Sequence, residues 1–362
     1  MQQSYRAALV ALLALFVLLA APMADYGQAL AKKAAQAEKD RPRAKSRKAA
    51  PVRKAARNEG KTAKKVRHGR KAVAPVPADV ENEEGDIGSC EVPTLTVKSA
   101  MLWNASTGEL LYEQNPDFQI PPASLTKILT LYIIFDAIRQ GKLRPWDVVD
   151  VSERAATQGG STMRLRNGES VKVTDMIKGI AVASANDACM AMADYLEGGN
   201  VDAFVALMND TAKRLGMSNS VFMNPNGLPA EGQLTTARDM LRLASAYLEQ
   251  FPKALTIHSM QFFTHNNRQR HNANSLLAHY EGCDGLKTGF VCASGYNIVA
   301  TAKRGDTRLI AVVLGSRSPV VRQRETAKLL DKGFKLAAIR KATTPAVVAA
   351  RPAPQPEATA AQ

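Results

Sequence analysis

Residue types that commonly carry metal or hydrolase chemistry are scarce in this chain of 362 residues. It has five histidines and four cysteines, and no cysteine pair has metal-ligand spacing with histidines. The sequence contains neither a Gly-x-Ser-x-Gly turn nor a His-Glu-x-x-His helix. These absences argue against a zinc site and against a Ser-His-Asp hydrolase.

Long hydrophobic runs are almost absent too, and no later segment reaches the length of a membrane span. The one uninterrupted apolar run extends from Ala7 to Ala21, behind Arg6. It is shorter than the roughly 20 residues that a spanning helix needs, and it is typical of the apolar region of a secretory signal. We therefore predict that residues 1–31 are a signal peptide or, alternatively, a retained N-terminal anchor. In both cases the rest of the chain is exported to the periplasm or cell envelope.

Acidic residues are nearly absent from residues 32–71, which contain 17 Lys and Arg but only Glu38, Asp40 and Glu59. This segment carries most of the formal net charge of +15. Residues 32–88 also lack aromatic side chains and are rich in Ala, Lys, Arg and Pro. They cannot bury a core and are predicted to be a disordered basic linker. Export removes nucleic acid from reach, so we expect residues 32–71 to contact anionic lipid or an acidic wall polymer instead.

Nearly all aromatic and branched apolar residues lie between residues 90 and 340, where we expect one folded domain, followed by a disordered Ala/Pro-rich tail over residues 341–362. The residue pattern predicts strands at both ends of this domain: 100–104, 109–112, 286–290, 297–303 and 307–314. Helical periodicity predicts helices over 124–138, 174–183, 187–197, 201–215 and 322–336. This order predicts a mixed α/β domain whose sheet joins its first and last segments.

The four cysteines are Cys90, Cys189, Cys283 and Cys292. An exported protein can form disulfides, and the sequence does not choose among the three pairings that four cysteines allow. A bridge between Cys283 and Cys292 is disfavoured, because an extended strand between them would hold their ends too far apart. Cys189 lies among Ala and Met in a helical pattern, which is consistent with a buried thiol.

The first of three short motifs is Ser124-Leu125-Thr126-Lys127, at the start of a predicted helix. Residues three apart share a helix face, so Lys127 can approach the Ser124 hydroxyl. A lysine that apolar neighbours desolvate can lose its proton and act as a base. Alone, the motif is equally compatible with the start of a surface helix.

The other two motifs carry groups that are suited to substrate binding. Ser184-Ala185-Asn186 lies between two predicted helices, where a turn can project a hydroxyl and an amide into a cleft. Ser and Asn are also ordinary helix-cap residues. Lys287-Thr288-Gly289 lies in a predicted strand, where glycine allows close approach of an extended peptide. A plain amphipathic strand with an exposed lysine would have the same pattern.

In this order the three motifs resemble the Ser-x-x-Lys, Ser-x-Asn and Lys-Thr-Gly signature of penicillin-binding proteins and class A β-lactamases. Over about residues 96–338 the chain is similar to the low-molecular-mass, serine-type D-alanyl-D-alanine carboxypeptidases. Other matching stretches are Gly160–Met163, Asn224–Leu228, Asn272–Leu277 and Leu309–Gly315. The resemblance implies a β-lactamase/transpeptidase-like α/β fold, with an antiparallel sheet flanked by helices and a helical subdomain.

The resemblance also implies a catalytic mechanism and its substrate. Ser124 would attack the carbonyl between the two terminal D-alanines of a peptidoglycan stem peptide and form an acyl-enzyme. Lys127 would accept the Ser124 proton, and Ser184 would help return it to the leaving amine. β-Lactams would then be covalent inhibitors, and no metal or organic cofactor is implied.

Six further residues are implied in substrate binding. Asn186 would bond the substrate amide and help position Lys127, and the backbone N–H groups of Ser124 and Phe290 would form an oxyanion hole. The strand motif, including Gly289, would receive the substrate. Its terminal carboxylate would be held by Lys287, Thr288 and Arg322; Arg317 and Arg324 are nearby alternatives to the last.

Some features depart from the family or leave alternatives open. Phe290 stands where several relatives carry His or Tyr. No convincing Glu-x-x-x-Asn element lies between the first two motifs, which argues against a true β-lactamase. A D,D-endopeptidase that cuts cross-links shares the same motifs. A non-catalytic wall-binding protein is the alternative of another class, but it would be expected to lose one of them.

Overall fold

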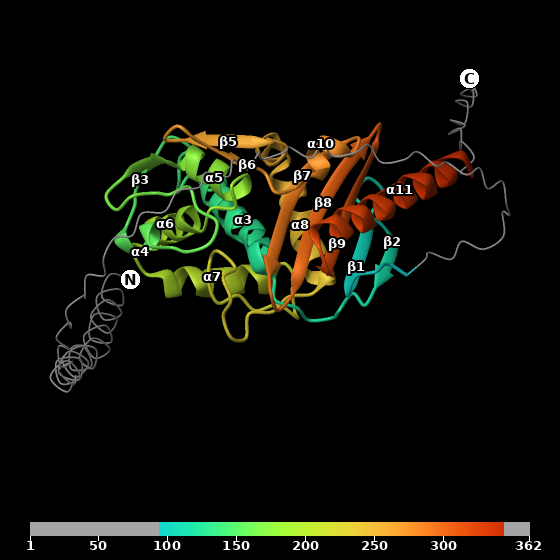
Figure 1. The fold of residues 1–362 in the computed structure, drawn as a ribbon, viewed down its shortest axis with the longest axis horizontal. Coiled ribbons are helices and arrows are strands. Elements are labelled where there is room, and N and C mark those ends of the chain that lie inside the picture. Colours follow the sequence, from blue (N-terminus) through green and yellow to red (C-terminus); the bar gives the residue numbers. More distant parts are fainter. Residues whose placement is uncertain (1–93, 344–362) are drawn as a thin grey trace, which may run out of the picture. The chain divides into compact units, whose positions relative to one another are not determined.

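The computed structural model describes residues 94–343 (Figure 1). The predicted signal peptide, the basic linker, Cys90 and the tail from residue 344 lie outside the described residues. Within residues 94–343, no helix combines the length and the apolar character needed to cross a membrane.

The described residues form a five-stranded antiparallel sheet in the order β2-β1-β9-β8-β7. Its strands are β1 (Ser99–Asn104), β2 (Glu109–Gln114), β7 (Cys283–Val291), β8 (Gly295–Arg304) and β9 (Thr307–Ser316). All were predicted, and β1 pairs with β9, so the sheet does join the first and last segments of the domain. β7 is an edge strand, which leaves one side of its backbone free of sheet pairing.

Helices cover both faces of this sheet (Figure 1). Alternate residues of β9 point to opposite faces: Ala311 and Val313 belong to a core with helix α11 (Pro319–Thr343), whereas Ile310 and Val312 belong to a larger core. That core is shared with α8 (Ala237–Gln250) and the remaining helices. The centres of β8 and β9 are therefore apolar on both faces, as their sequences are.

The helical region contains α3 (Thr126–Arg139), α5 (Val173–Ala181), α6 (Asn186–Leu196) and α7 (Val201–Arg214). Each was predicted to within a few residues. Helix α3 is buried over Thr126–Ile134, as its nearly uniform apolar sequence indicates. The elements not predicted are α8 and a set of short ones: η1 (Ala123–Leu125), β3 (Val148–Asp150), α4 (Glu153–Ala156), β4 (Ser170–Lys172), η2 (Pro252–Ala254), α9 (Leu255–His258), β5 (Phe262–His265), β6 (Arg268–His271) and α10 (Leu276–His279).

Helix α11 is longer at both ends than the predicted 322–336. At its start the Ser318 hydroxyl accepts a hydrogen bond from the Val321 N–H at 3.1 Å, which caps the first turn. At its end no helix breaker intervenes before Pro345, so the helix includes Lys341 and Ala342, which were predicted to begin the tail.

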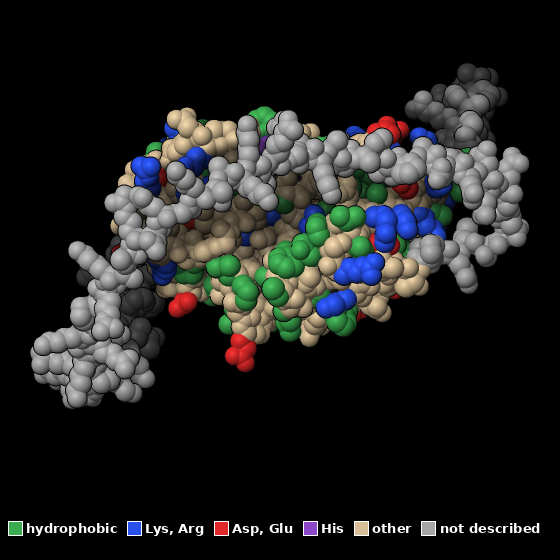
Figure 2. Space-filling model, in the orientation of Figure 1, with side chains coloured by type: hydrophobic (Ala, Val, Ile, Leu, Met, Phe, Trp, Pro, Cys, Tyr) green, Lys and Arg blue, Asp and Glu red, His purple; other side chains and the backbone are tan. Residues whose placement is uncertain are grey.

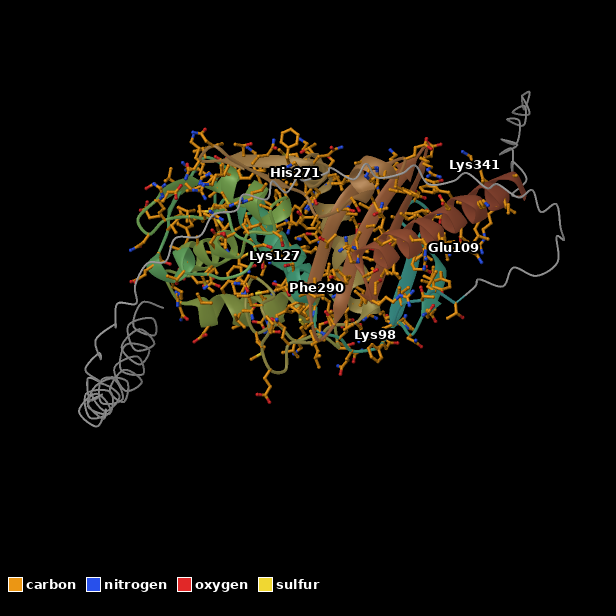
Figure 3. The ribbon with its side chains drawn as sticks, in the orientation of Figure 1. Lys98, Glu109, Lys127, His271, Phe290 and Lys341 are labelled. Carbon is orange, nitrogen blue, oxygen red and sulfur yellow. The ribbon has the colours of Figure 1, made fainter. Side chains whose placement is uncertain are left out.

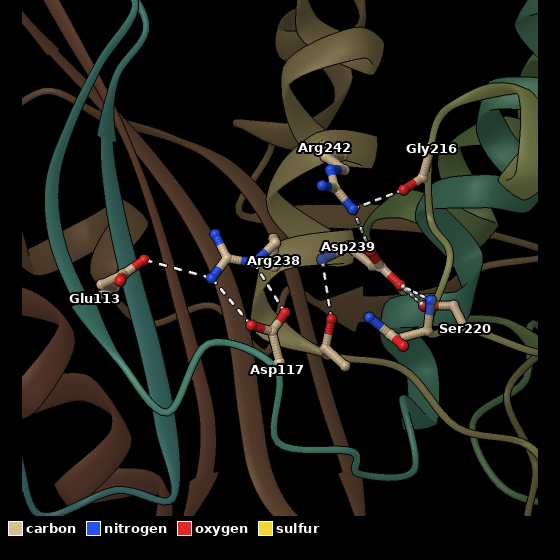
Figure 4. Close-up of polar contacts among 9 residues, drawn as sticks. Glu113, Asp117, Gly216, Ser220, Arg238, Asp239 and Arg242 are labelled. Atoms are coloured by element: carbon tan, nitrogen blue, oxygen red, sulfur yellow. Dashed lines mark hydrogen bonds and ion pairs between the residues drawn. The ribbon is translucent and has the colours of Figure 1, made fainter.

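A polar network at the start of α8 fixes the segment that leads to the first motif (Figure 4). Arg238 binds Asp117 through two hydrogen bonds of 2.8 and 3.0 Å, and this contact lowers the pKa of the Asp117 carboxyl. One residue on, the buried Asp239 carboxylate accepts hydrogen bonds from the Asn219 N–H and the Ser220 hydroxyl, both at 2.8 Å. The Arg238 contacts thus hold the chain before Ser124 against α8, and the Asp239 contacts hold the turn at Asn219 and Ser220 against the same helix.

Candidate active site

The Ser124 hydroxyl lies at the junction of η1 and α3, beside the amine of Lys127. Lys127 is fully buried, and its Nζ donates hydrogen bonds to Ser124 Oγ at 2.9 Å and to the backbone oxygen of Asn226. Burial lowers the pKa of Lys127 from 10.5 to about 8, since removal from water disfavours the charged amine. The sequence motif therefore forms the expected pair of a hydroxyl and a lysine whose pKa lies close to neutral pH.

Asn226 was not among the predicted site residues, although it lies in the quoted Asn224–Leu228 stretch. Its carbonyl is positioned by a tight turn, in which Asn224 Oδ1 accepts a hydrogen bond from the Gly227 N–H at 2.7 Å. Gly227 has φ +80°, and a Cβ built on it would lie 1.9 Å from the Ala123 carbonyl oxygen. Only glycine permits this approach, which packs the turn directly against η1.

The second motif connects α5 to α6. Ser184 adopts φ 56°, an uncommon left-handed conformation for a residue other than glycine, of the kind that often marks functional turns. Within residues 94–343 its side chain forms no hydrogen bond. The Asn186 amide donates to the Gly159 carbonyl at 2.7 Å, and no hydrogen bond joins it to Lys127 in the described part of the chain.

Two buried residues behind this motif support it. Asp187 is 1% exposed and accepts hydrogen bonds of 3.0 Å from the N–H groups of both Met163 and Leu165, which anchors the preceding loop to α6. Cys189 is a free, buried thiol whose pKa burial raises to about 12, so it is neutral beside Lys127. Cys283 and Cys292 are free as well, which confirms that they do not bridge each other.

The third motif lies on β7, where this edge strand meets η1. A Cβ built on Gly289 would lie 3.0 Å from the Ser124 backbone nitrogen, so glycine at this position lets β7 pack closely against η1. Thr288 is buried and Phe290 is half exposed, with its ring centroid 4.3 Å from that of Tyr296. Figure 3 labels Lys127 on α3 and Phe290 on β7, where the helical region adjoins the sheet.

Three cationic side chains are buried around this meeting point. Lys287 donates to the Thr288 carbonyl at 2.9 Å, and burial together with the neighbouring charges of Lys127 and Arg322 holds its pKa well below the usual value. Arg322 on α11 is also buried, and burial lowers its pKa. Its Nη2 donates to the Ala273 carbonyl at 3.3 Å, but its Nε has no partner within residues 94–343. Buried cations with unused donors are suited to binding an anion.

The space-filling view shows this face hollowed, with lysine and arginine side chains inside the hollow (Figure 2). Arg317 and Arg324, the alternatives to Arg322, are exposed. Among residues 94–343, no group of three or more His, Cys, Asp or Glu side chains is arranged to hold a metal ion. The site therefore presents a hydroxyl, an amine and anion-binding groups, a combination suited to acyl transfer.

Comparison with known proteins gives the same family as the motifs. The sequence model described as D-alanyl-D-alanine carboxypeptidase matches residues 87–318. The D-alanyl-D-alanine carboxypeptidase DacC of Escherichia coli is 41% identical over 252 residues, which cover 68% of this chain and 63% of that protein. The D-alanyl-D-alanine carboxypeptidase DacF of Bacillus subtilis is 40% identical over 241 residues, which cover 66% of this chain and 62% of that protein. The chain thus spans less than two thirds of the length of these relatives.

Solved structures give the corresponding fold. The D-alanyl-D-alanine carboxypeptidase DacD of Francisella tularensis superposes with a TM-score of 0.66 at 33% identity, covering 70% of this chain and 74% of that one. Penicillin-binding protein D2 of Listeria monocytogenes, in an ampicillin-bound form, has a TM-score of 0.59 at 32% identity. This match covers 67% of this chain and 100% of that one. The expected penicillin-binding fold is confirmed, and the chain belongs to the D-alanyl-D-alanine carboxypeptidase family.

Proposed function

We propose that this chain is a serine D,D-carboxypeptidase that removes the terminal D-alanine from peptidoglycan stem peptides. The observation that carries the proposal is the 2.9 Å contact between Lys127 Nζ and Ser124 Oγ. The lysine is fully buried, and its pKa of about 8 lets it exchange a proton near neutral pH, as a base beside a nucleophile must. The relatives' names supply the substrate class, a D-alanyl-D-alanine peptide.

In the proposed acylation, Ser124 Oγ attacks the carbonyl carbon between the two D-alanines, and its proton passes to the neutral Lys127 amine. The C–N bond then breaks, the leaving amine takes up a proton by way of the Ser184 hydroxyl, and D-alanine departs. The oxyanion would be stabilised by the backbone N–H groups of Ser124 and Phe290. The close approach of Gly289 to the Ser124 nitrogen supports this assignment. Water then hydrolyses the ester and regenerates the serine.

Substrate binding follows from the buried cations. The terminal carboxylate would lie against Lys287, Thr288 and Arg322, where the unused Arg322 Nε offers a donor. The Asn186 Nδ2 is already engaged by Gly159, so the side-chain oxygen of Asn186 is the atom that would accept the substrate amide N–H. An extended substrate could also pair with the free edge of β7.

The test of the nucleophile is intact-mass analysis after incubation with penicillin, followed by peptide mapping. We expect one adduct on Ser124 in the wild type, none in Ser124→Ala, and an unchanged adduct in Ser218→Ala, which alters an exposed serine. Release of D-alanine from a pentapeptide then distinguishes the carboxypeptidase from an endopeptidase, which would cut only cross-linked peptides. A folded wild type that forms no adduct would overturn the mechanism.

We further propose that the protein acts in the cell envelope, where its substrate lies, with residues 1–31 as export signal or anchor. Residues 32–88 would act as a linker whose basic part, 32–71, contacts anionic lipid or acidic wall polymer through its positive charge. Association of the full chain with envelope fractions should weaken as salt is raised. Salt-independent association would count against the electrostatic contact.

A further inference from the structure

His258 is the only buried histidine among residues 94–343, with 1% of its surface exposed. It ends α9, and both nitrogens of its ring have a partner. Nδ1 lies 3.0 Å from the Leu286 carbonyl oxygen on β7, and Nε2 lies 3.0 Å from the Tyr247 hydroxyl on α8. The proposed mechanism uses neither His258 nor Tyr247. A buried titratable group that connects three elements next to the third motif therefore has no assigned role.

The two partners fix the tautomer of this imidazole. A carbonyl oxygen only accepts hydrogen bonds, so Nδ1 carries the proton and donates to Leu286, while Nε2 accepts from the Tyr247 hydroxyl. Burial, together with the positive charge of Lys287, lowers the pKa of His258 to about 4, which leaves the ring neutral at neutral pH. His258 is thus a fixed hydrogen-bond donor to β7 and not a proton carrier.

His258 is itself held on two sides. The Tyr247 ring packs edge to face against the His258 ring, with ring centroids 5.6 Å apart, and against Phe135 of α3, with ring centroids 6.0 Å apart. The backbone oxygen of His258 accepts a hydrogen bond from Asn272 Nδ2 at 3.2 Å. Through Leu286, His258 therefore ties the edge strand of the sheet to side chains of α8 and of α3, the helix of the first motif.

The bond from His258 reaches the edge of β7 that has no strand partner. In an antiparallel sheet the N–H and C=O groups of one residue point to the same side, and successive residues alternate. Because the Leu286 carbonyl is bonded to α9, it faces away from β8, and Thr288 and Phe290 face the same free edge. Consistent with this, the Thr288 carbonyl accepts a hydrogen bond from a side chain, the Lys287 amine. His258 thus occupies the free edge at Leu286 and leaves the positions of Thr288 and Phe290 to an extended substrate.

The start of β7 packs closely against α9. A Cβ built on Gly285 would lie 3.6 Å from His258 Cβ and 3.2 Å from another side chain of α9. The Gly285 carbonyl also accepts a hydrogen bond from Asn274 Nδ2 at 3.0 Å. With Gly285 and Leu286 both held, the backbone has little freedom where it leads into Lys287.

We propose that His258 is a positioning residue for the substrate carboxylate. Its bond to Leu286 fixes the backbone that carries Lys287, and it closes the free edge of β7 so that an extended substrate can pair only from Thr288 onward. The C-terminal end of the substrate then lies against Lys287. His258 touches neither the substrate nor the reacting atoms and acts through Lys287. The inference rests on the proposed function, from which it takes the carboxylate-binding role of Lys287.

The test compares acylation of Ser124 by benzylpenicillin with acylation by its methyl ester, which lacks the free carboxylate. Both second-order constants come from time-resolved intact-mass analysis of the full chain, and their ratio is the carboxylate preference. Charge-assisted hydrogen bonds predict a preference of about 10- to 100-fold in the wild type. A variant that only loosens the fold slows both reagents alike and leaves this ratio unchanged.

Two amide variants separate the two bonds of His258. In His258→Asn the side-chain nitrogen takes the place of Nδ1 and can still donate to Leu286. In His258→Gln it takes the place of Nε2 and reaches Tyr247 instead. We expect the Asn variant to keep the wild-type preference and the Gln variant to reduce it about tenfold, because the backbone before Lys287 is no longer held. A ratio that stays at the wild-type value in His258→Gln, or that falls equally in both variants, would overturn the proposal.

The matched control is His279→Gln, which makes the same change at an exposed histidine at the end of α10. It should leave both acylation constants at their wild-type values. The tautomer is measured separately, from the nitrogen NMR chemical shifts of the His258 ring near neutral pH. We expect a protonated Nδ1 and an unprotonated Nε2. A ring that carries its proton on Nε2 would refute the bond to Leu286 on which the inference depends.

The two proposals fail in different ways. A wild type that forms no penicillin adduct would overturn the proposed function, and this inference with it. An adduct that forms without any preference for the free acid would overturn the carboxylate-binding role of Lys287 and the role of His258 that depends on it. If the adduct forms and the preference is present, but His258→Gln retains it, only the role of His258 is wrong.

Discussion

Acylation of Ser124 by penicillin should accelerate steeply as the pH rises from 6 to 9, because the reaction needs the neutral form of Lys127. Burial lowers the Lys127 pKa to about 8, so a higher pH converts more of this residue to the free amine. The neutral fraction is about 1% at pH 6, about 10% at pH 7 and about 90% at pH 9 for such a pKa. The second-order acylation constant, which reports the free enzyme, should therefore rise about 90-fold over this range.

The assay is time-resolved intact-mass analysis at fixed penicillin concentration, with the fold monitored at each pH by circular dichroism. Lys127→Arg is the matched variant, since arginine keeps the positive charge but does not lose its proton in this range. Penicillin should acylate the Lys127→Arg variant slowly at every pH. A wild-type rate that stays flat or falls between pH 6 and 9 would contradict the assignment of Lys127 as base. So would a Lys127→Arg variant that acylates at the wild-type rate.

Three substitutions, the first paired with a control, test the architecture of the site. Gly227→Ala places a Cβ 1.9 Å from the Ala123 carbonyl oxygen, so it should lower the free energy of unfolding in urea by about 2–5 kcal/mol and slow acylation. The control is Gly232→Ala, at φ +76° in open space. It should lower the free energy of unfolding by only about 1–2 kcal/mol and leave acylation intact. Gly289→Ala should slow acylation about 10- to 100-fold, since its Cβ would crowd the Ser124 nitrogen and shift η1 against β7. Asp187→Asn removes one of the two oxygens that accept from the Met163 and Leu165 N–H groups, so it should lower the free energy of unfolding by about 1–3 kcal/mol. An unchanged urea midpoint would contradict the role of this carboxylate as an anchor.

The elements that the sequence predicted are those with long, regular patterns. Strands β8 and β9 and helix α3 are apolar over most of their length, so their composition predicts that they are buried on several sides. The three-residue ladder of β3 and β4 has no such pattern, because too few residues contribute to distinguish a strand from a loop. Helix α8 was missed although Thr236 caps it, with its side chain accepting from the Asp239 N–H at 3.1 Å.

Among the site residues, too, some contacts could be predicted from the sequence and others could not. Side-chain chemistry and spacing predicted the contact between Ser124 and Lys127, which the structure shows. The Asn226 carbonyl is a backbone atom, and its contact with Lys127 depends on a turn that brings residues 99 positions apart together. Helical periodicity alone could have distinguished Arg322 from Arg317 and Arg324. Arg322, Glu325, Thr326, Leu329 and Leu330 share one buried face of α11, whereas Arg317 precedes this helix and Arg324 lies off that face.

The pairing of β1 with β9 also has a consequence for the timing of folding. The sheet cannot close until the last strand of the domain is available, as the contact between the Ser106 hydroxyl and the Asp306 carbonyl, 200 residues apart in sequence, illustrates. Contacts of such long range slow folding, since a large loop must close before they form. The chain therefore remains without its third motif and its completed sheet throughout most of its synthesis, and the three motifs can come together only after β7, β8 and β9 have emerged.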